Sequence, residues 1–301
     1  MQQLVLSHRL GRLWTDESAL SDPFPKYPTT RTESSMLHKR LTATSAVLAA
    51  ALIQAPAAAQ KLHVNPRWEE CSFQLDPSLT QSAWHRFTRE AGLAVYFRPL
   101  DDARPLGKGK FEVSALQWQT KIDDAAPAWN DTFVHPDSTH WLIEGSRLMI
   151  PGLSVRVGVG AKTDVAIYAT KTPGANYGFY GGAVQRNIVG GESSKWNASA
   201  RASLIRMYGP DDVDLPVYGA DLIASRTLTL TRWATVSPYA GVSGYLSRAH
   251  EKTDRVNLAD ENVFGTRAAV GAELRVFKAR LAAEYTAARV GGLSLKIGFG
   301  A

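Results

Sequence analysis

Strict two-residue alternation of apolar and polar side chains recurs through the C-terminal two thirds of this 301-residue chain. The last strand-like stretch, residues 293–300, reads Leu-Ser-Leu-Lys-Ile-Gly-Phe-Gly, so that large apolar residues occupy every second position. The segment from Leu281 to Ala287 and the segment from Val270 to Val276 repeat the pattern. Alternation with this period predicts β-strands that have one face in an apolar environment.

The alternating segments divide the chain into strands of similar length. We expect nine strands, at 153–161, 164–171, 177–189, 195–208, 216–228, 235–249, 262–276, 278–288 and 293–300. Residues 110–119 add a tenth, because outer-membrane barrels favour an even number of strands. In lipid only closure of the sheet satisfies every backbone N–H and C=O group. The prediction is an all-β fold: an antiparallel closed transmembrane β-barrel of about ten strands, within a range of eight to twelve.

Aromatic residues near the strand ends fit the thickness of a membrane. Trp196 and Tyr208 share one face and lie twelve residues apart, which corresponds to about 40 Å along a strand or ~28 Å at a 45° tilt. We expect Trp196, Tyr208 and Phe299 to be aromatic residues at the lipid interface.

If the apolar faces contact lipid, the opposite faces line the lumen. The charged residues expected there are Arg156, Arg201, Asp221, Arg267, Glu273, Arg275, Arg280, Glu284 and Lys296. A barrel of this size has little room for water, so opposed charges should pair, for example Glu284 with Arg275 or Lys296. The lumen is then a structural ion-pair core or, alternatively, a narrow pore that prefers anions.

The N-terminal part has the features of an exported protein. A basic stretch at Met36–Arg40, an apolar run at 46–53 and small residues at 55–59 form a secretory signal peptide over 36–59. We predict that residues 1–35 are a mis-called extension upstream of the true start. The single cysteine, Cys71, excludes a disulfide framework.

Between the signal peptide and the barrel the pattern changes. Leu79, Ala83, Trp84, Phe87 and Ala91 recur at helical spacing. Residues 60–106 are therefore expected to be a small helix-containing segment, acting as a periplasmic cap or a plug, and residues 107–301 to be the barrel.

Residues 107–301 resemble the small outer-membrane β-barrel proteins of Gram-negative bacteria, through their alternation, the aromatic residue in the last strand and the signal peptide. The resemblance implies a location in the outer membrane, contact with its lipid, and recognition of the last strand by the barrel-assembly machinery. In this chain Phe299 is followed by Gly300 and Ala301, which departs from the usual terminal aromatic residue. A soluble alternative is a periplasmic β-barrel that binds a small ligand and turns its apolar faces inward.

The sequence provides no defined catalytic, cofactor or metal motif. Ser247, His250 and Glu251, together with Asp211 and Asp212, could be drawn into a hydrolase site, but Ser247 and His250 should lie on opposite faces of one strand.

The remaining candidates are weaker still. His135 and His140 flank Asp137 in a presumed loop without a further well-placed ligand. A net charge of +6 without a dense basic block does not indicate nucleic acid as a partner. We predict an integral outer-membrane barrel that is structural or a passive narrow pore with a mixed-charge lumen. The alternatives are a surface adhesion or interaction barrel and a barrel hydrolase.

Overall fold

The computed structural model describes residues 72–98, 100–134, 143–144, 147–171 and 175–300. All of them belong to the second of the two units into which the chain divides, Ala57–Ala301. The expected extension at 1–35, the expected signal peptide at 36–59 and Cys71 lie outside the described residues. Within the described part, no helix is both long and apolar enough to cross a membrane.

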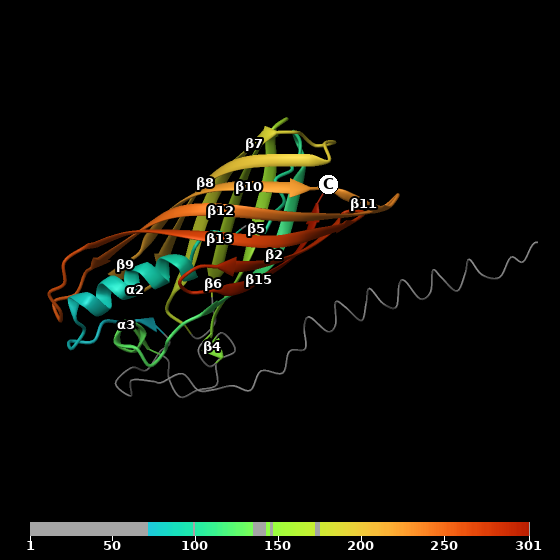
Figure 1. Ribbon diagram of the computed structural model, residues 1–301. Helices are drawn as coiled ribbons and strands as arrows, with labels where there is room; N and C mark the ends of the chain where they lie inside the picture. The colour runs from blue at the N-terminus through green and yellow to red at the C-terminus, as the bar shows by residue number, and fades with distance from the viewer. Residues whose placement is uncertain (1–71, 99, 135–142, 145–146, 172–174, 301) are drawn as a thin grey trace, which may run out of the picture. The chain divides into compact units, whose positions relative to one another are not determined.

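Ten long strands form a closed antiparallel barrel (Figure 1). They are β2 (Phe111–Lys121), β5 (Arg147–Gly160), β6 (Thr163–Lys171), β7 (Gly178–Val189), β8 (Trp196–Tyr208), β10 (Pro216–Arg226), β12 (Ala234–Glu251), β13 (Glu261–Val276), β14 (Ala279–Ala287) and β15 (Gly292–Gly300). Each pairs with the next along the chain, and β15 pairs with β2, so that no edge of the barrel is left open. The predicted fold class is confirmed.

Short elements complete the described chain. They are β1 (Ser72–Phe73), α2 (Gln81–Ala94), α3 (Pro127–Asn130), β3 (Phe133–Val134), β4 (Ile143–Glu144), β9 (Val213–Asp214) and β11 (Leu228–Thr231). β1 pairs with β3 in a separate two-stranded sheet. β4 pairs with β5, and both β9 and β11 pair with β12.

The strand that opens the barrel, β2, lies where the sequence predicts it, but β5 begins earlier than expected. It starts at Arg147 rather than at residue 153. Three consecutive side chains, Leu148, Met149 and Ile150, are all buried. Because the chain is covered on both faces there, the alternation that marks a strand is lost.

The two ends of the barrel differ in how the strands are connected. At one end, here called the turn end, the connections are 161–162, 190–195, 227–233 and 277–278, and the barrel itself begins and ends there at β2 and β15. At the other end, the loop end, the connections are 122–146, 172–177, 209–215, 252–260 and 288–291. The two shortest connections, 161–162 and 277–278, lie at the end that holds both barrel termini, and the longest, 122–146, lies at the loop end.

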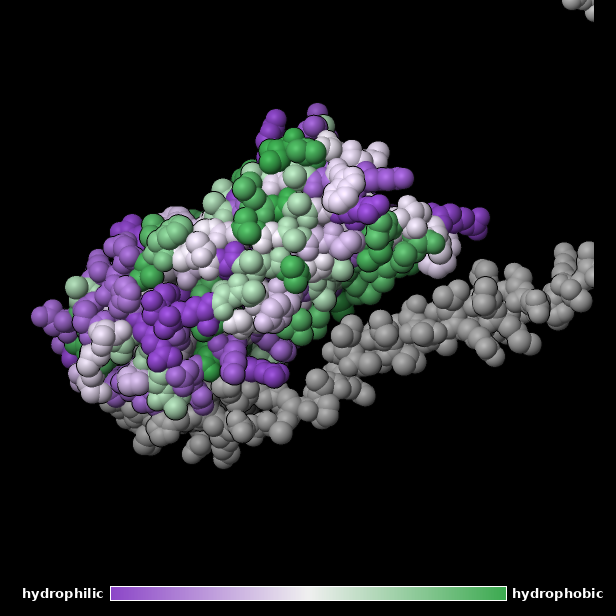
Figure 2. Space-filling view, viewed as in Figure 1, coloured by the Kyte–Doolittle hydropathy of each residue, from purple (hydrophilic) through white to green (hydrophobic). Residues whose placement is uncertain are grey.

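The apolar rows of the strands face outward. Leu153, Val242 and Val270 are 64%, 58% and 57% exposed although each lies in mid-strand. Figure 2 shows hydrophobic and pale residues over the strands and hydrophilic residues gathered around the end that carries α2. The soluble alternative required these rows to point inward, and the structure places them on the opposite face.

Helix α2 covers the loop end of the barrel. It begins after Thr80, whose Oγ1 accepts a hydrogen bond from the Ala83 N–H at 3.3 Å. Its apolar face buries Trp84 and Phe87 completely, and each such side chain contributes roughly 1.5–3 kcal/mol to folding. Gly92 lets the helix approach β12, because a Cβ at this position would lie 2.6 Å from the Cβ of Ser247.

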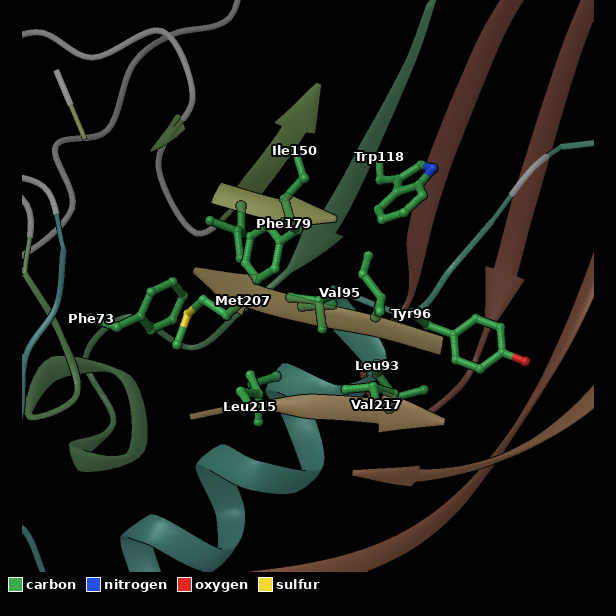
Figure 3. Packing of buried hydrophobic residues seen from close by; sticks show 14 of the residues in the cluster. Phe73, Leu93, Val95, Tyr96, Trp118, Ile150, Phe179, Met207, Leu215 and Val217 are labelled. Carbon is green, nitrogen blue, oxygen red and sulfur yellow. The ribbon is translucent and has the colours of Figure 1, made fainter. Parts of the chain in front are cut away.

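After α2 the chain runs inside the barrel from the loop end to the turn end. We call its described residues, 95–98 and 100–106, the lumen segment. Figure 3 shows Val95 and Tyr96 among side chains of the barrel wall such as Phe179 and Val217. Gly107, which has a φ of +92°, follows the segment, and β2 begins at Phe111.

Candidate functional site

The lumen near the loop end is filled by aromatic and aliphatic side chains. Trp84 stacks on Phe87 with ring centroids 5.5 Å apart, and Phe87 meets the edge of Trp129 at 5.4 Å. Deeper in the barrel, Trp118 stacks on Tyr168 at 4.7 Å. These rings close the mouth of the barrel beneath α2 with well-packed apolar surface.

A first polar cluster lies below the aromatic layer and centres on Asp221 of β10. Its carboxylate accepts hydrogen bonds from Tyr96 Oη and from Arg201 Nε, both at 2.8 Å, and a further one from Ser243 Oγ. The guanidinium of Arg267 lies 4.5 Å from the centroid of the Tyr96 ring. Tyr96 of the lumen segment thereby contacts β10 and β13 directly, and Arg201 of β8 and Ser243 of β12 complete the cluster.

A second cluster, nearer the turn end, joins the lumen segment to the wall by ion pairs. Asp101 pairs with Arg156 of β5, with 3.1 Å between oxygen and nitrogen, and with Lys296 of β15. Asp102 pairs with Arg275 of β13 at 3.0 Å and with Arg104 of the segment itself at 3.1 Å. The two neighbouring aspartates thus contact three different strands.

The wall strands are also paired with one another at this level. Lys296 lies 2.7 Å from Glu112 and 3.5 Å from Glu273, and Arg280 lies 2.9 Å from Glu112. The two carboxylates and the Lys296 ammonium are nearly or fully buried, and the Arg280 side chain is 11% exposed. Because removing one partner of a buried pair leaves an uncompensated charge, each member constrains the others.

Backbone groups of the lumen segment find their partners on the wall. The Ala103 N–H donates to Ser225 Oγ at 3.1 Å, and the Leu106 N–H donates to Asp164 at 3.1 Å. The Arg98 carbonyl accepts a hydrogen bond from Trp118 Nε1 at 3.1 Å. A segment without secondary structure can be buried only when its polar groups are satisfied in this way.

A small cavity lies beside the lumen segment. A cavity of about 10 Å³ lies between Asp101, Arg156, Asp164 and Arg201, which is room for about one water molecule.

The structure places all nine of the charged residues expected in the lumen on the inner face, and each takes part in at least one ion pair. The expected partner of Glu284 is wrong, however. Glu284 pairs with Arg267 at 3.4 Å, not with Arg275 or Lys296. The register explains the difference, because Glu284 lies opposite Gly271 while Arg275 is four residues farther toward the turn end, about 13 Å away along the strand.

Six charged residues of the lumen escaped the sequence analysis: Arg98, Asp101, Asp102, Arg104, Glu112 and Asp164. Glu112 and Asp164 each alternate with an outward valine, Val113 and Val165, and period two could have found them. The other four lie outside any strand, so alternation gives no signal for them.

The outward aromatic residues occupy both ends of the apolar surface. Trp196 and Phe299 lie near the turn end and are 61% and 60% exposed. Tyr208 lies at the loop end of β8, is 38% exposed, and donates a hydrogen bond to the Thr170 carbonyl at 2.6 Å. Tyr180, Tyr218 and Tyr285 also point outward near the loop end.

A closed antiparallel barrel with an apolar exterior, aromatic residues at both borders and a charged interior is the architecture of proteins that span bacterial outer membranes. The chain is an integral outer-membrane β-barrel.

The comparisons with known proteins concern solved structures. No protein-family model matches the chain, and no curated protein matches it. The β domain of the Bordetella autotransporter BrkA is similar with a TM-score of 0.35 and 12% identity, over 64% of this chain and 98% of that one. LpxR from Salmonella typhimurium gives a TM-score of 0.32 and 12% identity, over 63% and 99% of the two chains. The attachment invasion locus protein Ail of Yersinia pestis gives 0.23 and 14%, over 64% and 99%.

The residues weighed for a hydrolase site do not come together. Ser247 is fully buried beneath α2, whereas the side chain of His250 is 57% exposed and pairs with Asp260 at 2.6 Å. Asp212 accepts a hydrogen bond from the Leu75 N–H at 3.0 Å and so has a structural role.

The histidines weighed for a metal site, His135 and His140, lie outside the described residues. In the part of the chain that the structure describes, no group of three His, Cys, Asp or Glu side chains could hold a metal ion.

Proposed function

We propose that the protein is a closed membrane anchor that presents its helical N-terminal element and its long connections as an interaction surface outside the cell. The single observation that supports this most strongly is the occupied lumen. The lumen segment is attached by ion pairs to β5, β13 and β15, and by side chain–backbone hydrogen bonds to β2, β6 and β10. A barrel whose lumen is filled in this way is better suited to anchoring a surface element in the membrane than to conducting ions.

The filled lumen argues against the passive narrow pore. A hydrated ion needs a continuous water path, and the cavity of about 10 Å³ beside the lumen segment has room for about one water molecule. Opening a path would separate buried charges such as Asp101 and Lys296, which are expensive to leave unpaired.

The orientation follows from the connections. Outer-membrane barrels turn short connections toward the periplasm and long ones outward. By this rule the loop end faces outward and carries α2, α3 and the small β1–β3 sheet. The N-terminal segment would then be a plug from residue 95 onward, and its helix would cover the outer mouth instead of the periplasmic one.

The outer rim has the polar character of a recognition surface. A surface pocket of about 380 Å³ lies on the barrel wall at the loop end, lined by residues that include Arg206, Tyr218, Arg248, His250 and Asp260. Arg248 has no carboxylate within 4.0 Å among the described residues. This mixture of donors and acceptors suits a polar partner better than an apolar ligand.

Conductance separates the anchor from the pore. In planar bilayers the purified protein should give no stable current steps at either polarity, whereas a known porin measured in the same bilayers should. Stable ohmic steps that persist after repurification would contradict the proposal. The heat-dependent shift in gel mobility that closed barrels show provides the control for folding.

Cysteine labelling tests the orientation. In a Cys71→Ser background, Ser82→Cys on exposed α2 should react with a membrane-impermeant maleimide in intact cells. The matched variant Lys278→Cys, exposed at the turn end, should react only after the outer membrane is permeabilised. The reverse pattern would show that α2 faces the periplasm.

A further inference from the structure

The connections at the two ends of the barrel carry opposite charge. Those at the turn end, together with residues 107–110, contain one acidic residue, Glu192, and six basic ones. The basic residues are Lys108, Lys110, Lys162, Lys195, Arg232 and Lys278. Connections at the loop end contain ten acidic and three basic residues. The turn end is therefore a strongly positive face and the loop connections are negative.

These basic side chains are exposed and mostly unpaired. All six are exposed to solvent. Lys110 pairs with Glu192, but among the described residues the other five have no carboxylate within 4.0 Å. By contrast, Arg206 at the loop end is paired with Asp214 at 2.8 Å. The positive charge of the turn end is thus free to attract an anion.

Four of the six basic residues directly adjoin an outward aromatic residue in the sequence: Lys110 precedes Phe111, Lys195 precedes Trp196, Arg232 precedes Trp233, and Lys278 follows Phe277. Each of these aromatic side chains is exposed, from 38% for Trp233 to 80% for Phe277. Aromatic rings occupy the border of the hydrocarbon region, and neighbouring Lys and Arg side chains extend from there into the headgroup layer.

Contacts between the turns hold the aromatic residues in place. Trp233 stacks on Phe277 with ring centroids 5.6 Å apart and planes 7° apart. Phe277 has a φ of +54°, an uncommon conformation for a residue with a bulky side chain, and its N–H donates to the Trp233 carbonyl at 3.1 Å. Arg226 lies over Trp196, 5.2 Å from the ring centroid. The border is therefore built from linked turns rather than from isolated side chains.

We propose that this basic and aromatic collar at the turn end binds the phosphodiester headgroups of anionic phospholipids in the membrane leaflet next to it. Lys110, Lys195 and Lys278 reach the depth at which phosphates lie because each sits one residue beyond the aromatic border. The connections at the loop end carry a net negative charge instead, so the preference for anionic lipid should belong to one leaflet only.

Spin-labelled lipids test the proposal. The protein is reconstituted in phosphatidylcholine vesicles at low ionic strength, and electron paramagnetic resonance gives the association of labelled phosphatidylglycerol relative to labelled phosphatidylcholine. The wild type should prefer phosphatidylglycerol by about fivefold or more, the factor that one lysine contributes near an anionic surface. Salt at about 1 M should reduce the preference, since it shortens the screening length to roughly 3 Å.

The variant that tests the collar neutralises four unpaired lysines: Lys108→Gln, Lys162→Gln, Lys195→Gln and Lys278→Gln. Its preference for phosphatidylglycerol should fall severalfold from the wild-type value, with Lys110 and Arg232 left in place, while its heat-dependent gel shift remains. A preference near one in the wild type, or an unchanged preference in this variant, would overturn the proposal.

A matched control neutralises four exposed basic residues at the loop end: Lys121→Gln, Arg147→Gln, Arg248→Gln and Lys252→Gln. It should keep the wild-type preference. An equal loss in both variants would contradict the assignment to the turn end. Because conductance is not involved, failure of this test is distinct from failure of the proposed closed anchor.

Discussion

Replacing Lys296 by methionine tests the ion-pair network that holds the lumen segment in the barrel. The ammonium contacts three carboxylates, those of Asp101, Glu112 and Glu273, and the side chain is 1% exposed. Methionine keeps most of the volume and removes the charge. Each carboxylate retains an arginine partner, so we expect a loss near the lower end of the range for breaking a buried pair, about 3 kcal/mol in the free energy of unfolding.

The assay is urea unfolding of the protein in lipid vesicles, followed by tryptophan fluorescence and by the gel shift on heating. Ile297→Met is the matched control, because Ile297 is the next residue on the same strand but points outward with 57% exposure. It should change the free energy of unfolding by less than about 1 kcal/mol. If Lys296→Met is as stable as the wild type, the network does not hold the lumen segment and the reasoning is wrong.

Three further substitutions probe other parts of the structure. Gly92→Val should lift α2 from Ser247, because the added Cβ would lie 2.6 Å from the serine Cβ. Limited proteolysis should then cut the helix while the heat-dependent gel shift of the barrel remains. A helix that resists cleavage would refute the contact. Glu90→Ala removes the carboxylate that accepts a hydrogen bond from Trp129 Nε1 at 2.8 Å and that, together with Asp123, raises the pKa of Arg86 by hydrogen bonding. We expect the free energy of unfolding to fall by about 1–3 kcal/mol. An unchanged free energy of unfolding would show that the packing of α2 and α3 does not need this contact. Ile167→Arg, on the lipid face of β6 with 60% exposure, should lower the free energy of unfolding in vesicles by about 2–4 kcal/mol, and an unchanged value would place this face outside the hydrocarbon region.

The strands could be predicted from the sequence because the bilayer imposes a simple rule on each of them. Residues such as Leu295 and Ile297 face opposite environments from their neighbours, and the alternation extends over whole strands. The rule fails where the environment is the same on both faces. Leu148 to Ile150 are all buried, and alternation therefore does not predict the beginning of β5.

The lumen segment could not be predicted in this way. Asp101 and Lys296 are 195 residues apart in the sequence, and their pairing depends on the closure of the barrel around the segment. Nothing local to Asp101 or Asp102 distinguishes these residues from a solvated loop. The helix α2 was visible from its apolar stripe, but the end of the barrel that it covers depends on the direction in which the chain passes through the lumen.

The lumen segment lies against the inner wall of the barrel, and an engineered disulfide tests this placement most directly. In a Cys71→Ser background, Ala103→Cys should crosslink to Ser225→Cys in isolated outer membranes, because the Ala103 N–H donates to Ser225 Oγ at 3.1 Å. The control pairs Ala103→Cys with Ala224→Cys, the adjacent residue that faces outward. We predict a crosslink for the Ser225 pair and none for the Ala224 pair. Equal crosslinking of both pairs, or of neither under oxidising conditions, would contradict an occupied lumen.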